Sequence, residues 1–166
     1  PHSRFTVLDT RSLAVTRRIA LRGDYGVDAL SPRGDVLYLI HHIVGSGGTR
    51  YQVQAYDLGA GRLLPGVIAD KRQAGWVMAG SPVARATSPG GRWVYTLYQQ
   101  QDNYPFVHAL DTSSRTAVCV GLPVDWTKPW VSTAHLALVG GKLRIEANGG
   151  RTRVLVDTRT FAVITP

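Results

Sequence analysis

The sequence predicts an all-β fold built from four-stranded antiparallel sheets that repeat along the chain. Two observations indicate this: a strand phrase ending in aspartate recurs four times, and a phrase with a glycine-containing turn recurs three times. The composition agrees with it. Eighteen glycines and nine prolines suit a chain with many tight turns, and 44% hydrophobic residues are enough for a packed core.

The aspartate phrase is an apolar strand, an aspartate, a short polar turn and a return strand. Its aspartates are Asp9, Asp57, Asp111 and Asp157, at intervals of roughly 50 residues. An aspartate at a strand end can accept hydrogen bonds from the backbone of the turn. We therefore predict that these four residues form turns and do not catalyse a reaction. The predicted return strands are Ala14–Ala20, Leu63–Ala69, Thr116–Gly121 and Phe161–Ile164.

The glycine phrase precedes the last three aspartate phrases. It is a strand, a turn in which proline and glycine supply the backbone angles, and a second strand. The third copy lacks the Ser-Pro pair that opens the turn in the other two. The predicted strand pairs are Val27–Leu30 with Val36–His41, Val83–Thr87 with Trp93–Tyr98, and His135–Leu138 with Leu143–Ala147.

Four strands per repeat of roughly 50 residues match the blade of a β-propeller. If the strands are lettered A to D outward from the axis, the chain reads C-D and then A-B-C-D three times, or about three and a half blades. We place the half blade at 1–21 and the blades at 22–70, 71–122 and 123–166. We expect the natural protein to continue upstream. We also expect the open ends to expose apolar surface that self-associates or pairs with the missing blades.

Ser31 to Tyr38, followed by Ala55-Tyr56-Asp57, resembles the bacterial YVTN/WD40-like propeller repeats, in which an SPDG…LYV phrase precedes a V…DT phrase. The match recurs at Ser88 to Tyr95 with Asp111-Thr112, and in part at Asp157-Thr158. Arg33 and Gly90 stand where that pattern prefers aspartate, and the WD dipeptide is absent. The resemblance implies a propeller in an extracytoplasmic or cell-surface protein of the secreted or anchored actinobacterial type. It does not imply an activity.

The distribution of charge and the length of the apolar stretches limit which kinds of partner are expected. The formal charge is +8, but the basic residues are scattered, with no run longer than Arg17-Arg18, so we predict no nucleic-acid partner. No apolar stretch approaches the roughly 20 residues of a membrane span, so none is predicted in this segment. Cys119 is the only cysteine, which excludes an internal disulfide, and we predict that it is a small core residue.

The candidate site lies on the long loops. Strand parity places the long D-A and B-C loops on one face of the predicted blades and the short A-B and C-D turns on the other. Long loops on a rigid scaffold often carry function, and aromatic residues with arginine anchor binding surfaces. The alternative is that the tryptophans only fill gaps between blades. The predicted ligand-binding residues are Trp76, Tyr104, Trp126, Trp130, Arg72 and Asp102.

Patterns of catalytic or metal-ligating residues are missing. His41 and His42 are adjacent, so they face opposite sides of a strand, and Gly45 to Gly48 lacks the lysine and helix of a phosphate-binding loop. Asp102-Asn103 offers too few ligands for a cation, and His108 is predicted to be packed or partly exposed. We predict no catalytic residue, metal or cofactor. The favoured function is non-enzymatic binding or scaffolding of a protein or glycan. The alternative is a hydrolase, lyase or quinoprotein-like enzyme with part of its active site in upstream blades.

Overall fold

The computed structural model describes residues 1–45, 48–72, 78–100, 104–125 and 127–165, with the backbone alone at 44, 45, 48 and 49. The described residues form 14 strands and one short 3₁₀ turn, Val131–Thr133. No helix in this part of the chain is long and apolar enough to cross a membrane.

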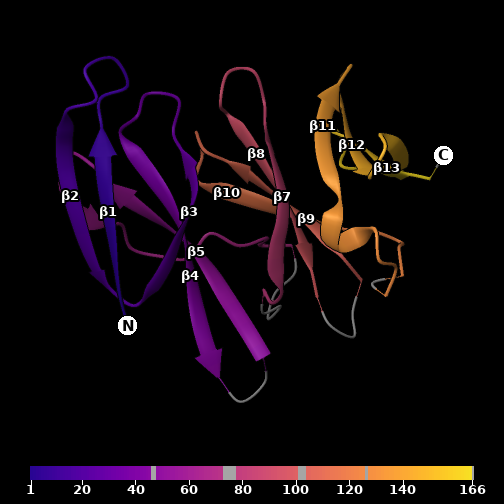
Figure 1. Cartoon of the computed structure of the whole chain (residues 1–166), viewed down its shortest axis with the longest axis horizontal. Helices are drawn as coiled ribbons and strands as arrows, with labels where there is room; N and C mark the ends of the chain where they lie inside the picture. The colour runs from indigo at the N-terminus through magenta and orange to yellow at the C-terminus, as the bar shows by residue number, and fades with distance from the viewer. Residues whose placement is uncertain (46–47, 73–77, 101–103, 126, 166) are drawn as a thin grey trace.

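The strands form four sheets in chain order, and every hydrogen-bonded neighbour pair is antiparallel (Figure 1). The all-β fold of four-stranded propeller blades predicted from the repeats is therefore confirmed. The first sheet has two strands, β1 (His2–Leu8) and β2 (Val15–Arg22). The second has β3 (Asp24–Leu30), β4 (Val36–Gly45), β5 (Gly48–Asp57) and β6 (Arg62–Leu63). The third has β7 (Ser81–Thr87), β8 (Trp93–Gln99), β9 (Phe106–Asp111) and β10 (Thr116–Gly121). The fourth has β11 (His135–Val139), β12 (Lys142–Ala147), β13 (Arg151–Asp157) and β14 (Val163–Ile164).

Two strand lengths differ from the sequence prediction. The expected loop after His41 is instead an extension of the β4–β5 hairpin, which stays paired as far as Gly45 and Gly48. The return strand expected at 63–69 is only β6, and Gly66, with a φ of 92°, turns the chain out of the extended conformation. The chain then rejoins the sheet at Ile68, whose N–H donates to the carbonyl of Val53.

The sheets pack face to face, and each of the three interfaces has its own hydrophobic core. Alternation along β4 shows how one strand serves two cores: Tyr38 and Ile40 face the third sheet, whereas Leu37 and Leu39 face the first. In β8, likewise, Tyr98 belongs to the core shared with the second sheet, and Leu97 to the core shared with the fourth. Strands buried on both faces explain why β8 and β9 are apolar along most of their length.

The four repeated aspartates close turns, as predicted. Asp9, Asp111 and Asp157 each accept two backbone N–H bonds through one carboxylate oxygen, and Asp57 accepts one. In every copy the residue four positions later donates its N–H to the aspartate carbonyl and has a positive φ. These residues are Leu13, Gly61, Arg115 and Phe161, with φ values of 56°, 69°, 57° and 59°.

The outer faces of the end sheets carry charged residues together with exposed apolar ones, and the expectation that these faces associate stays a prediction. The face of the first sheet turned away from the second carries Arg4, Arg18 and Arg22. In the fourth sheet, ion pairs such as Arg144 with Glu146, at 3.9 Å, lie on partly exposed positions. Exposed apolar side chains include Leu8 and Val15, which are cross-strand partners at one end of the first sheet, and Val139 in the fourth. Self-association or pairing with further blades stays a prediction.

Asp70, which follows the second sheet, is hydrogen-bonded to the third. Its buried carboxylate accepts the backbone N–H of Cys119 in the edge strand β10 at 2.9 Å and pairs with Arg72 at 2.7 Å. The Arg72 guanidinium, with help from the two backbone donors and against the effect of burial, lowers the pKa of Asp70 to about 2. Because the ordinary value is 3.8, this carboxylate stabilises the fold above about pH 4 and loses its contribution as the pH falls towards 2.

We expect Asp70→Asn to lower the free energy of unfolding at pH 7 by about 1.5–3 kcal/mol, because a charged, buried hydrogen-bond acceptor is lost. The difference from wild type should shrink between pH 4 and pH 2. Urea unfolding at several pH values measures both effects, with the exposed Asp125→Asn as control. A difference that does not depend on pH would contradict this role for Asp70.

Candidate binding site at the interface between the second and third sheets

The two sets of connections lie on opposite sides of the molecule. The far end of the β4–β5 hairpin points to one side, and the β3–β4 and β7–β8 turns lie on the other (Figure 1). We call these the loop side and the turn side. This is the arrangement that strand parity predicts.

Only part of the predicted loop-side site can be placed, since Trp76, Asp102 and Trp126 lie outside the described residues. Tyr104 is 64% exposed. Trp130 is partly buried against the core of the third and fourth sheets, and the Arg153 guanidinium lies 5.8 Å from its ring centroid. Arg72 is bound to Asp70. The structure thus shows one exposed aromatic residue and one that also packs, and their shared role stays a prediction.

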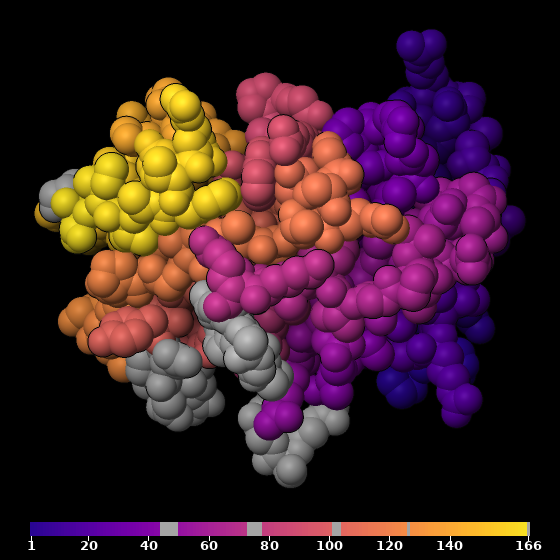
Figure 2. All heavy atoms as spheres, turned by 180° about the vertical axis from the view of Figure 1, so that it is seen from behind, coloured from indigo at the N-terminus to yellow at the C-terminus, as the bar shows by residue number. Residues whose placement is uncertain are grey.

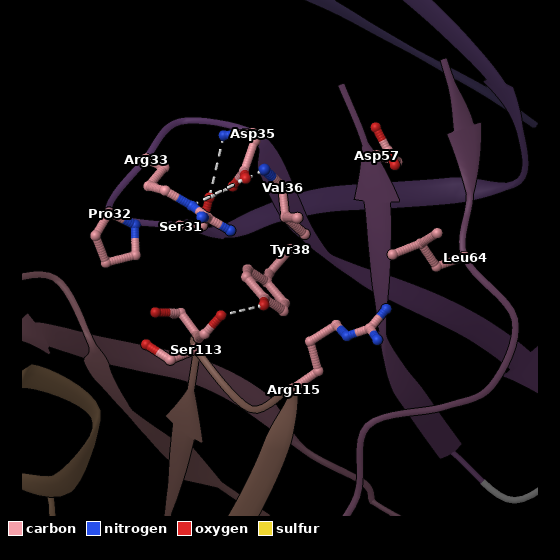
Figure 3. Close-up of a pocket in the computed structure, with 11 residues that line it drawn as sticks. Ser31, Pro32, Arg33, Asp35, Val36, Tyr38, Asp57, Leu64, Ser113 and Arg115 are labelled. Carbon is pink, nitrogen blue, oxygen red and sulfur yellow. Dashed lines mark hydrogen bonds and ion pairs between the residues drawn. The ribbon is translucent and has the colours of Figure 1, made fainter. Parts of the chain in front are cut away.

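A concave site lined by both sheets opens on the turn side, between the second and third sheets (Figure 3). We call it the seam cavity. Its volume is about 580 Å³, within the range typical of ligand sites. The second sheet contributes Ser31, Pro32, Arg33, Asp35, Val36, Tyr38, Asp57 and Leu64, and the third contributes Thr112, Ser113 and Arg115.

The walls of the seam cavity are held by hydrogen bonds. Tyr38, which is fully buried, donates its hydroxyl to the carbonyl of Thr112 at 2.5 Å and so joins the two sheets at the cavity floor. Ser31 accepts the backbone N–H groups of Asp35 and Val36, which closes the turn on one side. The site is therefore preformed, with little conformational entropy to lose on binding.

The charged side chains of the seam cavity differ in whether they have an ion-pair partner. Asp35 accepts the hydroxyl of Ser31 at 2.6 Å and pairs with Arg33 at 3.3 Å. The Ser31 hydroxyl is the main reason that the pKa of Asp35 is lowered. Arg115 differs, because none of the carboxylates in the described parts of the chain lies within 4 Å of its guanidinium. Figure 3 shows Arg115 reaching from its turn towards Leu64 and Asp57 of the neighbouring sheet.

Arg115 also occupies a strained backbone position. Its φ of 57° favours glycine, and the equivalent residue of the preceding repeat is Gly61. A side chain at such a position costs on the order of 1 kcal/mol. Phe161, at the same place, packs against Trp93 at a centroid distance of 5.4 Å, so its side chain contributes to a core. Arg115 and Leu13 are both exposed at this position, so what sets Arg115 apart is its charge and its place on the seam cavity.

The reactive groups beneath the surface are not activated. His108 and Cys119 face each other, with Nδ1 and Sγ 3.5 Å apart, but both are buried. Burial lowers the pKa of His108 and raises that of the Cys119 thiol to about 12, so both are neutral at pH 7. A catalytic thiol needs the opposite shift. This pair therefore belongs to the core, as predicted for each residue, and no group of side chains suited to hold a metal occurs among the described residues.

Sequence reasoning missed the seam cavity because its residues come from turns that were interpreted as structural. One signal was available: Arg115 stands four residues after the repeated aspartate, where Gly61 stands in the preceding repeat. The same comparison brings together a buried carboxylate and an arginine whose side chain is 35% exposed. Asp28 and Arg85 each lie three residues before the Ser-Pro pair, and they form an ion pair of 3.0 Å across the interface.

No protein-family model matches this chain, and no curated protein matches it in sequence. Among solved structures it is similar to hydrazine synthase of Kuenenia stuttgartiensis, with 19% identity, 87% of this chain and 35% of that chain covered, and a TM-score of 0.47. It is also similar to TolB from Acinetobacter baumannii, with 16% identity, 92% and 36% coverage, and a TM-score of 0.48. The chain thus spans about a third of each of these structures. Its assignment as propeller blades rests on strand order and face-to-face packing.

We expect Tyr38→Phe to lower the free energy of unfolding by about 1–2 kcal/mol, because the carbonyl of Thr112 loses its donor across the interface. Tyr25→Phe is the control, since it removes a longer, partly exposed bond to Gln54 and should cost less. Urea unfolding of both variants measures the difference. Equal midpoints for Tyr38→Phe and wild type would show that this bond does not hold the floor of the seam cavity.

Proposed function

We propose that this chain is part of a non-enzymatic binding propeller of the YVTN/WD40-like kind that presents its loop side to a protein or glycan outside the cytoplasm. The observation that carries the proposal is the placement of the predicted loops. The far end of the β4–β5 hairpin lies on the side opposite the short, hydrogen-bonded turns (Figure 1). Tyr104, which lies just before β9, is 64% exposed. Aromatic side chains presented by loops on a rigid scaffold are typical anchors of binding surfaces.

The ionisable groups support binding over catalysis. Asp9, Asp57, Asp111 and Asp157 hold turns through their carboxylates, and Asp70 holds a strand edge. The hydrogen bonds of its turn lower the pKa of Asp157 to about 2, so this group is a carboxylate at neutral pH with its acceptor oxygens already occupied. A general acid or base needs a pKa nearer the working pH.

Tyr104→Ala tests the loop side. We expect it to weaken partner binding at least tenfold, while the free energy of unfolding changes by less than about 0.5 kcal/mol, because the side chain is exposed. Co-sedimentation with insoluble chitin, cellulose and peptidoglycan examines glycans, and selection from a displayed library of protein fragments examines proteins. If the best ligand from either screen binds Tyr104→Ala as it binds wild type, the loop side around Tyr104 is not the recognition surface.

Trp130→Ala separates packing from recognition. Because the indole is partly buried and lies beneath Arg153, we expect a loss of about 2–3 kcal/mol in stability, less than for a fully buried tryptophan. Thermal and urea unfolding measure this loss. A variant as stable as wild type would show that Trp130 does not fill the gap between the third and fourth sheets.

A further inference from the structure

The seam cavity is one end of a longer groove. A second cavity of about 330 Å³ shares Leu64 and Arg115 with it and continues around the outer rim of the molecule. We call the two together the seam groove. Figure 2 shows the segment that follows β6 lying against the outer part of the third sheet. The second cavity is lined by Ala55, Leu64, Pro65, Gly66, Val67, Ile68, Lys71, Ser114, Arg115 and Thr116.

Two cations on the groove have no ion-pair partner among the described residues. Arg115 lines both cavities and Lys71 lines the second, and no ion pair within the described residues involves either cation. The carboxylates on the groove are already acceptors: Asp35 is bonded to Ser31, and Asp57 to the N–H of Ala60. The charged groups on the groove that remain available to a ligand are therefore mostly hydrogen-bond donors, the side chains of Arg115 and Lys71. Arginine matches a carboxylate in particular, because its guanidinium can donate two parallel bonds.

The groove also has an apolar wall beside Arg115. Leu64 lines both cavities, and Val67 is 43% exposed in the second. A ligand with an apolar side chain next to an acidic one would contact both the apolar wall and Arg115. Single-stranded nucleic acid is a poorer match, since its bases need aromatic platforms and the aromatic ring in the lining, Tyr38, is fully buried.

We propose that the seam groove binds an extended peptide segment of a partner protein, with an Asp or Glu carboxylate on Arg115 and a neighbouring apolar side chain against Leu64 and Val67. The charge and direction of the Arg115 side chain support this assignment. Glycine would fit the turn at position 115 without strain, and the side chain that stands there instead is a cation with no ion pair among the described residues, directed into the groove. The seam groove is separate from the loop side, so this proposal does not depend on the function proposed above.

A selection experiment tests the proposal without a known ligand. A displayed library of random dodecapeptides is selected on immobilised wild type, and the most enriched peptide is labelled and titrated against variants. Arg115→Gly removes the guanidinium and relieves the backbone strain at once. Leu13→Gly is the matched control, because it makes the same change in the turn of the first sheet, at a side chain that is 72% exposed. Tyr104→Ala controls for the loop side.

We expect the enriched peptides to contain Asp or Glu beside an apolar residue and to lose at least tenfold in affinity when that acid is replaced by its amide. Arg115→Gly should lose at least tenfold, whereas Leu13→Gly and Tyr104→Ala bind as wild type. Both glycine variants should melt at or above the wild-type temperature, which excludes unfolding as the cause of any loss.

Four results would overturn the proposal. They are no enrichment over uncoated beads, enriched peptides without acidic residues, undiminished binding to Arg115→Gly, and an equal loss in Leu13→Gly. A single-stranded DNA or a uronic acid oligosaccharide that displaces the peptide from Arg115 at lower concentration than the peptide itself would show that the groove serves that polymer instead.

Discussion

The structure depends on face-to-face packing of two-sided sheets, and above all on the interface between the second and third. Each of these sheets has apolar side chains on both faces, so neither can bury its surface alone. At this interface lie the stacked rings of Tyr51 and Tyr98, with centroids 4.4 Å apart, and the buried carboxylate of Asp28, which pairs with the partly exposed Arg85. A buried charge needs its partner, because an unpaired one destabilises a fold by several kcal/mol. The interface therefore fixes the relative position of the sheets as well as their contact.

Both candidate binding surfaces follow from that constraint. In the second and third sheets, packing on both faces leaves the strand ends and the sheet edges free to meet another molecule. The turn side is closed by local hydrogen bonds, and the seam cavity exists because two such turns, Ser31–Asp35 and Asp111–Arg115, face each other across the interface. The loop side holds the far end of the β4–β5 hairpin and the start of β9, just before which Tyr104 is exposed (Figure 1). Rigid sheets thus hold both surfaces, which suits binding by preformed sites.

The repeats made the architecture predictable. Periodic aspartates and glycine turns identified the sheets and the strand order, because turn chemistry is local in sequence. The extension of the β4–β5 hairpin was not predicted, since glycines between two strands are equally compatible with a loop. The outer faces of the end sheets combine charged residues with exposed apolar ones such as Leu8 and Val15, a mixture that the repeat pattern alone does not specify. The seam groove arises from residues far apart in the chain, Leu64 and Arg115 among them, and such a juxtaposition depends on how sheets pack.

The central claim is that the second and third sheets form one cooperative unit across their shared core. Hydrogen exchange at increasing, sub-denaturing urea concentrations tests it most directly, by comparing the opening free energies of amides in β4 and β5 with those in β8 and β9. We expect the four strands to open with one free energy and one dependence on urea. Opening of β4 and β5 at a clearly lower free energy than β8 and β9 would contradict the claim, because the sheets would then unfold independently.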